Sequence, residues 1–237
     1  MKKLFLPLFV YAFTLFSLQS CEYVDDDPEP RGTSTRNFNF TGFDQLEMGN
    51  AFHVNVKAGN TYAIAATGEL NDLDDLEIFT QDGELVVRYK DWRNRRKKMT
   101  IDVTMPNLSG VEFSGAVDAG IRGFENAREI DFELSGASQC NFIGSAKSIE
   151  VDLSGASYLS LVGGGQFLDG ELSGASELSS FDYQAEESDL QLSGASKGKV
   201  RVSKFLKADA SGASNLRYLG NPNVQKKVSG GSSVHQD

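Results

Sequence analysis

The sequence predicts an all-β protein built as a right-handed parallel β-helix, with about 19 residues per coil. Three observations favour this fold class. A Ser-Gly pair, usually extended to Ser-Gly-Ala, recurs seven times at intervals of about 19 residues. Alternating apolar and polar residues flank the copies, and this period of two is typical of strands with one buried face. The apolar residue at every sixth position that marks left-handed hexapeptide helices does not occur.

The first twenty residues have the features of a secretory signal. Lys2 and Lys3 precede an uncharged, largely apolar run from Leu4 to Leu18, which is shorter than the roughly 20 apolar residues of a membrane-spanning helix. Leu18-Gln19-Ser20-Cys21 then resembles the bacterial lipobox, whose cysteine is lipidated and becomes the mature N-terminus. We therefore predict a lipoprotein signal peptide over residues 1–20 and a lipid on Cys21. The alternative is an ordinary cleaved signal followed by an incidental cysteine.

Residues 21–36 are predicted to form an acidic tether. This segment contains prolines and Asp25-Asp26-Asp27, and it has almost nothing to bury. The three aspartates resemble the acidic signals that send some lipoproteins of the Bacteroides group to the cell exterior; the alternative is a solvated spacer. Either way the protein is expected to be an outer-membrane lipoprotein that faces the periplasm or the cell surface. Its contact with the membrane would be the N-terminal lipid.

Residues 37–106 are predicted to be an irregular N-terminal β section that caps the first coil. Short alternating stretches occur in this section at 52–56, 62–64, 76–78, 85–89 and 99–103. Asp82-Gly83 is typical of a hairpin turn. A solenoid needs such a cover, because open edge strands invite aggregation.

Residues 107–235 are predicted to form the repetitive β-helix, with two short strands in each coil. The Ser-Gly-Ala copies would make the corners, since glycine adopts backbone angles that are closed to other residues. Stacked coils bury the apolar faces that one coil cannot bury alone. This structural role accounts for the serines, because a hydrolase nucleophile would need a single Gly-x-Ser-x-Gly turn with acid and histidine partners. The predicted corner glycines are Gly115, Gly136, Gly155, Gly174, Gly194, Gly212 and Gly230.

The Leu-Ser-Gly-Ala-Ser copies resemble the putative auto-transporter adhesin, head GIN domain family. Residues 43–46, 49–54, 105–108 and 228–232 carry the same resemblance, which covers about residues 36–235. It implies that residues 37–235 together form one secreted, often lipid-anchored β-helical domain, typical of Bacteroides-type bacteria. It implies no reaction and brings no defined ligand-binding residues. Asn50 stands where many copies in the family have Ser or Gly.

Composition excludes several classes of protein. The formal charge of −10 argues against a nucleic-acid partner, because phosphate binding needs a basic surface. Two cysteines and two histidines cannot supply a disulfide framework or a four-cysteine zinc site. We therefore expect no metal and no cofactor. Cys140 lies in an alternating stretch and is expected to be a small buried hydrophobe.

One basic run stands out in this acidic chain and is the candidate ligand contact. Its cations could contact an acidic glycan, lipopolysaccharide or an acidic protein, and two nearby aromatic residues could stack on a sugar ring. The alternative is a solvated loop between two strands. The candidate residues are Tyr89, Trp92, Arg93, Arg95, Arg96, Lys97 and Lys98.

Two weaker patterns remain. One acid per coil precedes the motif, and these acids are expected to align along the helix axis, with interruptions at Gln191 and Lys227; they are Glu133, Asp152, Glu171 and Asp209. Such acids suit a solvated face, a weak cation or glycan site, or the clustered carboxylates of polysaccharide-active enzymes. The Gly-rich stretch at 163–169 is expected to be a flexible turn.

The function favoured by the sequence is a lipid-anchored cell-envelope binding or adhesion module without catalytic activity. Its partner would be a glycan or an envelope or host protein. Two alternatives stay open, a structural envelope scaffold and a β-helical polysaccharide-active enzyme. The sequence leaves the oligomeric state open.

Overall fold

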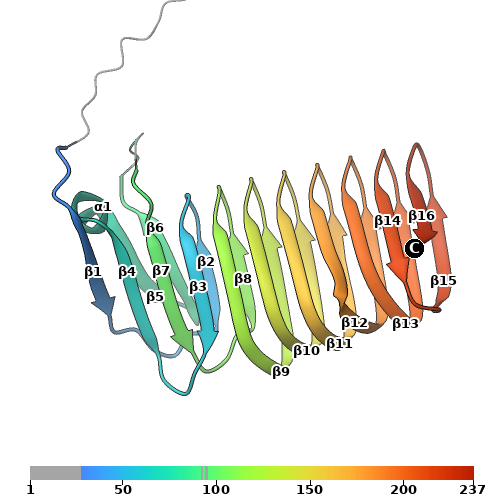
Figure 1. Cartoon of the computed structure of the whole chain (residues 1–237), viewed down its shortest axis with the longest axis horizontal. Coiled ribbons are helices and arrows are strands. Elements are labelled where there is room, and N and C mark those ends of the chain that lie inside the picture. Colours follow the sequence, from blue (N-terminus) through green and yellow to red (C-terminus); the bar gives the residue numbers. More distant parts are fainter. Residues whose placement is uncertain (1–27, 92, 94–95) are drawn as a thin grey trace, which may run out of the picture.

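The computed structural model describes residues 28–237 except 92, 94 and 95. This part of the chain forms an elongated solenoid of strands (Figure 1). Its elements are β1 (Thr33–Phe38), β2 (Gln45–Met48), β3 (His53–Ala58), β4 (Ala63–Glu69), α1 (Leu70–Asp75), β5 (Leu76–Gln81), β6 (Glu84–Tyr89), β7 (Thr100–Met105), β8 (Gly110–Phe113), β9 (Asp118–Leu134), β10 (Gln139–Leu153), β11 (Tyr158–Leu172), β12 (Glu177–Leu192), β13 (Lys197–Ala210), β14 (Asn215–Leu219), β15 (Asn223–Val228) and β16 (Ser233–Gln236). Within these residues, no helix has the length and apolarity of a membrane span.

The predicted parallel β-solenoid is confirmed, with about seven turns of about 19 residues each and an irregular N-terminal β section. Each of the strands β9 to β13 runs from one Ser-Gly corner to the next and pairs in parallel with its neighbours. A coil therefore holds one long bent strand where the sequence analysis expected two short ones. The ladder continues through the bend because its residues stay in register, as Gly144 does with Gly163.

The Gly-rich stretch at 163–169 lies inside β11, so the prediction of a flexible turn is wrong. These glycines allow adjacent coils to approach closely at the bend. A Cβ atom on Gly163 would lie 1.8 Å from the carbonyl oxygen of Gly144, and one on Gly165 would lie 2.0 Å from that of Ala146. Close backbone contact, and not mobility, requires glycine here.

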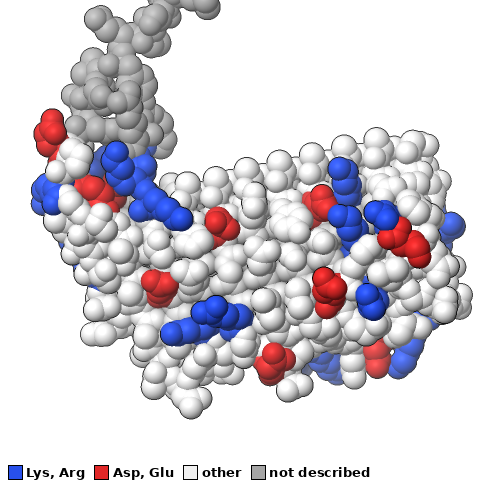
Figure 2. Space-filling view, in the orientation of Figure 1, with Lys and Arg blue, Asp and Glu red and all other residues white. Residues whose placement is uncertain are grey.

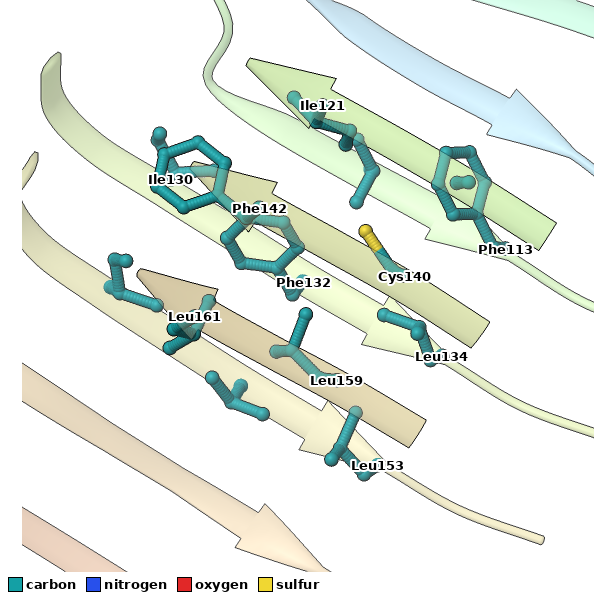
Figure 3. Close-up of a cluster of buried hydrophobic side chains, with 14 of the residues drawn as sticks. Phe113, Ile121, Ile130, Phe132, Leu134, Cys140, Phe142, Leu153, Leu159 and Leu161 are labelled. Atoms are coloured by element: carbon teal, nitrogen blue, oxygen red, sulfur yellow. The ribbon is translucent and has the colours of Figure 1, made fainter. Parts of the chain in front are cut away.

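The bend divides the solenoid into two opposed sheets with the core between them. We call the first the groove sheet; it contains β1, β4, β7, β3, the first halves of β9 to β13, β14 and β16. The second, the acid sheet, contains β6, β2, β8, the second halves of β9 to β13, and β15. Figure 3 shows side chains from both sheets meeting in the core, where the rings of Phe132 and Phe142 are 5.4 Å apart. Cys140 is fully buried among them, as predicted.

The Ser-Gly corners stack directly on one another along one edge of the solenoid. The seven corner glycines have φ between 68° and 73°. Asn50, with φ of 66°, holds the same position between β2 and β3. Each corner donates a backbone hydrogen bond to the one before it, as Ala156 N does to Gly136 O at 2.7 Å.

The order of coils in space differs from the order in the sequence at the N-terminal end. The coil made by β2 and β3 lies between the coil of β6 and β7 and the coil of β8 and β9. The β2–β3 coil of the N-terminal section is therefore inserted between two coils that come later in the chain. The sequence between β6 and β7 contains no Ser-Gly motif.

The end of the solenoid is closed by β1, β4, α1 and β5. β4 pairs antiparallel with β7, β5 pairs antiparallel with β6, and α1 connects β4 to β5. The hairpin turn predicted at Asp82-Gly83 is present, with φ of 51° and 91°. Residues 33–36, which the sequence analysis placed in the tether, lie in the edge strand β1, where Arg36 donates to the carbonyl of Leu73 at 2.8 Å.

Candidate functional site

The outward face of the groove sheet is hollowed around β3. A cavity of about 510 Å³ opens there, lined by residues of β1, β4, β7, β3, β9 and β10. β3 points His53, Asn55 and Lys57 to this face, and each lies directly beside a residue of β9. In Figure 1 these strands lie at the front, so the hollow is on the face that Figure 2 shows.

Small residues form the floor of this hollow. Gly120 of β9 and Ala65 of β4 occupy outward positions in the same row as Asn55. A Cβ atom on Gly120 would meet nothing within 4 Å, so the space above it is open. Asn37 of the edge strand β1 and Asn141 of β10 line opposite sides of the hollow. Ile143, which follows Asn141 by two residues in β10, also lines the hollow, and its exposed fraction is 54%. The hollow therefore exists because two positions of this row, Ala65 and Gly120, carry a methyl group or no side chain.

Two cations stand directly opposite each other at one end of the hollow. Lys57 pairs in register with Arg122 of the neighbouring parallel strand, and both side chains are exposed. Within residues 28–237, leaving aside 92, 94 and 95, neither has a carboxylate within 4.0 Å. The nearest acid in the lining, Asp102, accepts a hydrogen bond from Asn55 at 2.9 Å. In Figure 2 Lys and Arg gather in a patch over the lower ends of these strands.

A second hollow, of about 480 Å³, lies toward the corner edge of the same strands. His53 and Asp118 line it, and the distance between His53 Nδ1 and an oxygen of Asp118 is 3.1 Å. His53 and Asn55 are successive outward positions on β3, so the two hollows follow each other along this strand. We call the two together the β3 groove.

The predicted basic run reaches the second hollow but is divided between two roles. Arg96 Nη1 lies 3.1 Å from Asp72, its other terminal nitrogen donates to Asp75, and its guanidinium lies 3.7 Å from the centre of the Tyr89 ring. Only 14%, 7% and 3% of the Arg96, Asp72 and Asp75 side chains are exposed. Tyr89 also packs on Phe52, and burial raises its pKa. Arg96 is thus held against α1, with the Tyr89 ring stacked on its guanidinium.

The remaining residues of the basic run are distributed as follows. Arg93, Lys97 and Lys98 line the second hollow, and Lys97 and Lys98 are exposed. Trp92 and Arg95 lie outside the described residues, as do Cys21 and the predicted signal peptide. The run therefore supplies three cations to one end of the β3 groove. Sequence reasoning missed Lys57 and Arg122, which are 65 residues apart in the chain and carry no local motif.

The acid sheet carries the predicted row of carboxylates on the other side of the molecule. Glu133, Asp152 and Glu171 are direct neighbours in register, and Gln191 and Lys227 interrupt the row as expected. Two features go beyond the prediction. The row continues through Glu112 to Glu47, and a second row follows beside it, formed by Asp131, Glu150, Asp169 and Asp189. Burial and the neighbouring carboxylates raise the pKa of Glu112 and of Asp131.

One group in the described part of the chain could hold a cation. Carboxylate oxygens of Glu129, Asp131 and Glu150 all lie within 4.8 Å of one another. Asp131 Oδ1 is buried and has no hydrogen-bond partner. The group lies on the acid sheet, away from the β3 groove.

The described side chains give little support for nucleophilic catalysis. Burial raises the pKa of the Cys140 thiol, which disfavours the reactive thiolate. His53 contacts a carboxylate, but no hydroxyl or thiol of the described residues donates to it. The second serines of the corner motifs are buried, and Ser196 donates to Leu172 O at 3.2 Å and to Ser193 O at 2.8 Å. The hydroxyls of Ser176, Ser196 and Ser214 therefore hold the backbone of a neighbouring coil, whereas those of Ser138 and Ser157 have no partner among the described residues.

A family model described as "Putative auto-transporter adhesin, head GIN domain" matches residues 42–222, which is well over half of the chain. The match includes both β3-groove hollows apart from Asn37. Among the curated proteins compared, none is similar to this sequence.

Several solved structures of bacterial proteins share the fold. A putative adhesin from Bacteroides fragilis has a TM-score of 0.79 at 18% identity, over 87% of this chain and 95% of that one. A putative lipid binding protein from Parabacteroides distasonis has a TM-score of 0.71 at 16% identity, over 88% and 98%. A putative adhesin from Parabacteroides merdae has a TM-score of 0.67 at 20% identity, over 86% and 96%.

Proposed function

Since the chain belongs to the putative auto-transporter adhesin, head GIN domain family, we propose that it is a lipid-anchored binding module of the cell envelope that acts without catalysis. The β3 groove carries this proposal. It offers two adjoining hollows of about 510 and 480 Å³ on one strand face. Both hollows are lined by amides, cations and carboxylates, which suits recognition of a polar ligand.

The anchor in this proposal is a lipid on Cys21. Its support is the cysteine at the end of an apolar run, after Leu18 and the small Ser20. Each buried CH₂ of an acyl chain contributes about 0.8 kcal/mol, so two or three chains hold a protein on a membrane. The segment from Cys21 to the start of β1 at Thr33 would separate the solenoid from the bilayer.

The groove position also fits a module that presents one face outward. The tether joins β1, at the capped end of the solenoid, and β1 contributes Asn37 to the groove. The acid sheet on the opposite side would be repelled by anionic lipid.

The experiment uses cells that produce the full chain. Metabolic labelling with palmitate should mark the wild type and miss Cys21→Ala. Protease treatment of intact cells should remove the wild type while a periplasmic control protein survives. Labelling that is equal in the two variants would contradict the anchor, and protection from protease would contradict exposure at the surface.

Binding is tested with a matched pair of tryptophan variants. Gly120→Trp fills the groove, whereas Ser179→Trp adds the same side chain in the same outward row, two coils beyond Asn141. The purified chains are applied to an array of glycans and matrix proteins. We expect binding by the wild type and Ser179→Trp, and at least a tenfold loss for Gly120→Trp. Absence of binding by folded protein, together with envelope defects in a deletion strain, would favour the scaffold.

A further inference from the structure

We infer that the ligand of the β3 groove is an acidic polysaccharide whose sugars carry carboxylate groups, and that Lys57 and Arg122 hold one of these carboxylates. This inference rests on the proposed function and deepens it by naming the class of ligand. It starts from the direct pairing of two like charges at one end of the groove.

The Lys57–Arg122 pair is unfavourable in the free protein. Like charges directly opposite each other on neighbouring strands destabilise a sheet. Elsewhere along the solenoid, several cations pair with acids of a neighbouring coil, such as Lys199 with Glu177 at 2.8 Å and Lys207 with Asp189 at 2.7 Å. Among the described residues, Lys57 and Arg122 have no such partner. A carboxylate bound between them would supply it, and the guanidinium can hold a carboxylate through two parallel hydrogen bonds.

The rest of the lining suits a chain rich in hydroxyl groups. Asn37, Asn55 and Asn141 offer amide donors and acceptors, and Asp102 offers an acceptor. The exposed side chain of Ile143, beside Arg122 in register, can pack against the C–H face of a sugar ring. The centre of an interface with a protein partner is typically rich in aromatic residues, whereas the lining of the first hollow has no aromatic residue and one large exposed apolar side chain, that of Ile143.

The groove continues beyond the first cationic pair. His53 and Lys57 are separated by about 13 Å along β3, at about 3.3 Å per residue. Beyond His53 the second hollow adds Arg93, Lys97 and Lys98. A polymer with regularly placed carboxylates reaches both ends, whereas a single sugar acid reaches one. The acid rows lie on the opposite sheet, so a polyanion is guided to the groove face.

The probe is polygalacturonate, and its fully methyl-esterified form is the control, with the same backbone and no charge. Calorimetric titration of the purified full chain should detect binding of the acid form only. Lys57→Gln/Arg122→Gln should weaken binding at least tenfold. The control variant Arg128→Gln/Lys197→Gln removes the same charge from two exposed cations outside the groove and should bind like the wild type. Raising the salt concentration should weaken binding, because both cations are exposed.

Folding of the variants is checked by thermal denaturation. Removing a like-charge pair should leave the melting temperature of Lys57→Gln/Arg122→Gln equal to or above that of the wild type. Polygalacturonate should raise the melting temperature of the wild type and not that of the double variant.

Three outcomes would overturn the inference: no binding of polygalacturonate, equal binding of its ester, or unchanged binding by the Lys57→Gln/Arg122→Gln variant. Binding of heparin without polygalacturonate would overturn it in favour of sulfated ligands. None of these affects the array experiment with Gly120→Trp, so a wrong ligand class can be told apart from a wrong binding surface.

Discussion

Substitution of a single corner glycine tests whether the stacked Ser-Gly motifs are required by geometry. Gly155 has φ of +68°, in the left-handed region. A Cβ atom there would lie 2.5 Å from the carbonyl oxygen of Gly136 and 3.0 Å from its nitrogen. Gly155→Ala therefore combines backbone strain with a clash against the preceding coil.

The expected loss of stability follows from three contributions. Holding a non-glycine residue in the left-handed region costs about 1–2 kcal/mol. Relief of the clash displaces the backbone, and overpacking of this kind costs about 1–3 kcal/mol. The displaced carbonyl also accepts the hydrogen bond from Ala156 N at 2.7 Å, whose weakening costs up to about 1 kcal/mol. Together these contributions should reduce the free energy of unfolding of Gly155→Ala by about 2–6 kcal/mol.

Urea denaturation followed by far-UV circular dichroism measures this loss. Gly231→Ala is the control, because it places the same methyl group in a corner where φ is outside the left-handed region and the nearest contact is 3.6 Å. It also restores the Ser-Gly-Ala sequence of the other corners, so its unfolding free energy should stay within about 0.5 kcal/mol of the wild type. A similarly small effect of Gly155→Ala would refute the steric account.

Three further predictions concern individual polar and charged groups. The Ser157 hydroxyl is buried without a partner, so Ser157→Ala should be neutral or stabilising in urea denaturation, whereas Ser196→Ala, which breaks two hydrogen bonds to carbonyls, should cost about 1–2 kcal/mol. Arg96→Ala leaves two buried carboxylates without their cation and should cost about 3–5 kcal/mol in thermal denaturation, against less than about 1 kcal/mol for Arg88→Ala in an exposed pair. Burial and neighbouring acids raise the pKa of Glu112 in the folded state, so its ionisation opposes folding. Glu112→Gln should therefore be more stable than the wild type at pH 7, and the difference should vanish as pH falls through the raised pKa to below the unfolded value. A difference that persists in acid would contradict this assignment.

The regular part of the fold was predictable because its determinants are local and repeated. The Ser-Gly motif marks each corner, and the alternating flanks mark the buried face of each strand. Stacking at a constant period then places equivalent residues side by side, which is why the row from Glu133 to Glu171 could be predicted without a structure. The same logic accounts for the buried Cys140.

The irregular end was not predictable from the same signals. The β2–β3 coil is inserted between coils that come later in the chain. Pairing between strands that are so far apart in the sequence produces no repeated pattern of residues. A weak signal exists in Gly49-Asn50-Ala51, which occupies the corner position without the Ser-Gly motif. The pairing of Lys57 with Arg122 is a product of this insertion, so the central pair of the candidate site could not be anticipated. The six residues of α1 are too few for a helical period to show.

The division between regular and irregular coils suggests where binding resides. The first hollow draws its lining from β1, β4, β7, β3 and only the first two regular coils, β9 and β10. Deletion of residues 175–194 joins Gly174 to Ala195, preserves a Ser-Gly-Ala-Ser corner and removes one whole coil far from the groove. Solenoid stability is close to a sum over neighbouring repeats, so the shortened chain should fold, unfold at lower urea concentration and keep its affinity for the groove ligand. Loss of binding by a folded deletion variant would mean that the regular coils take part in recognition.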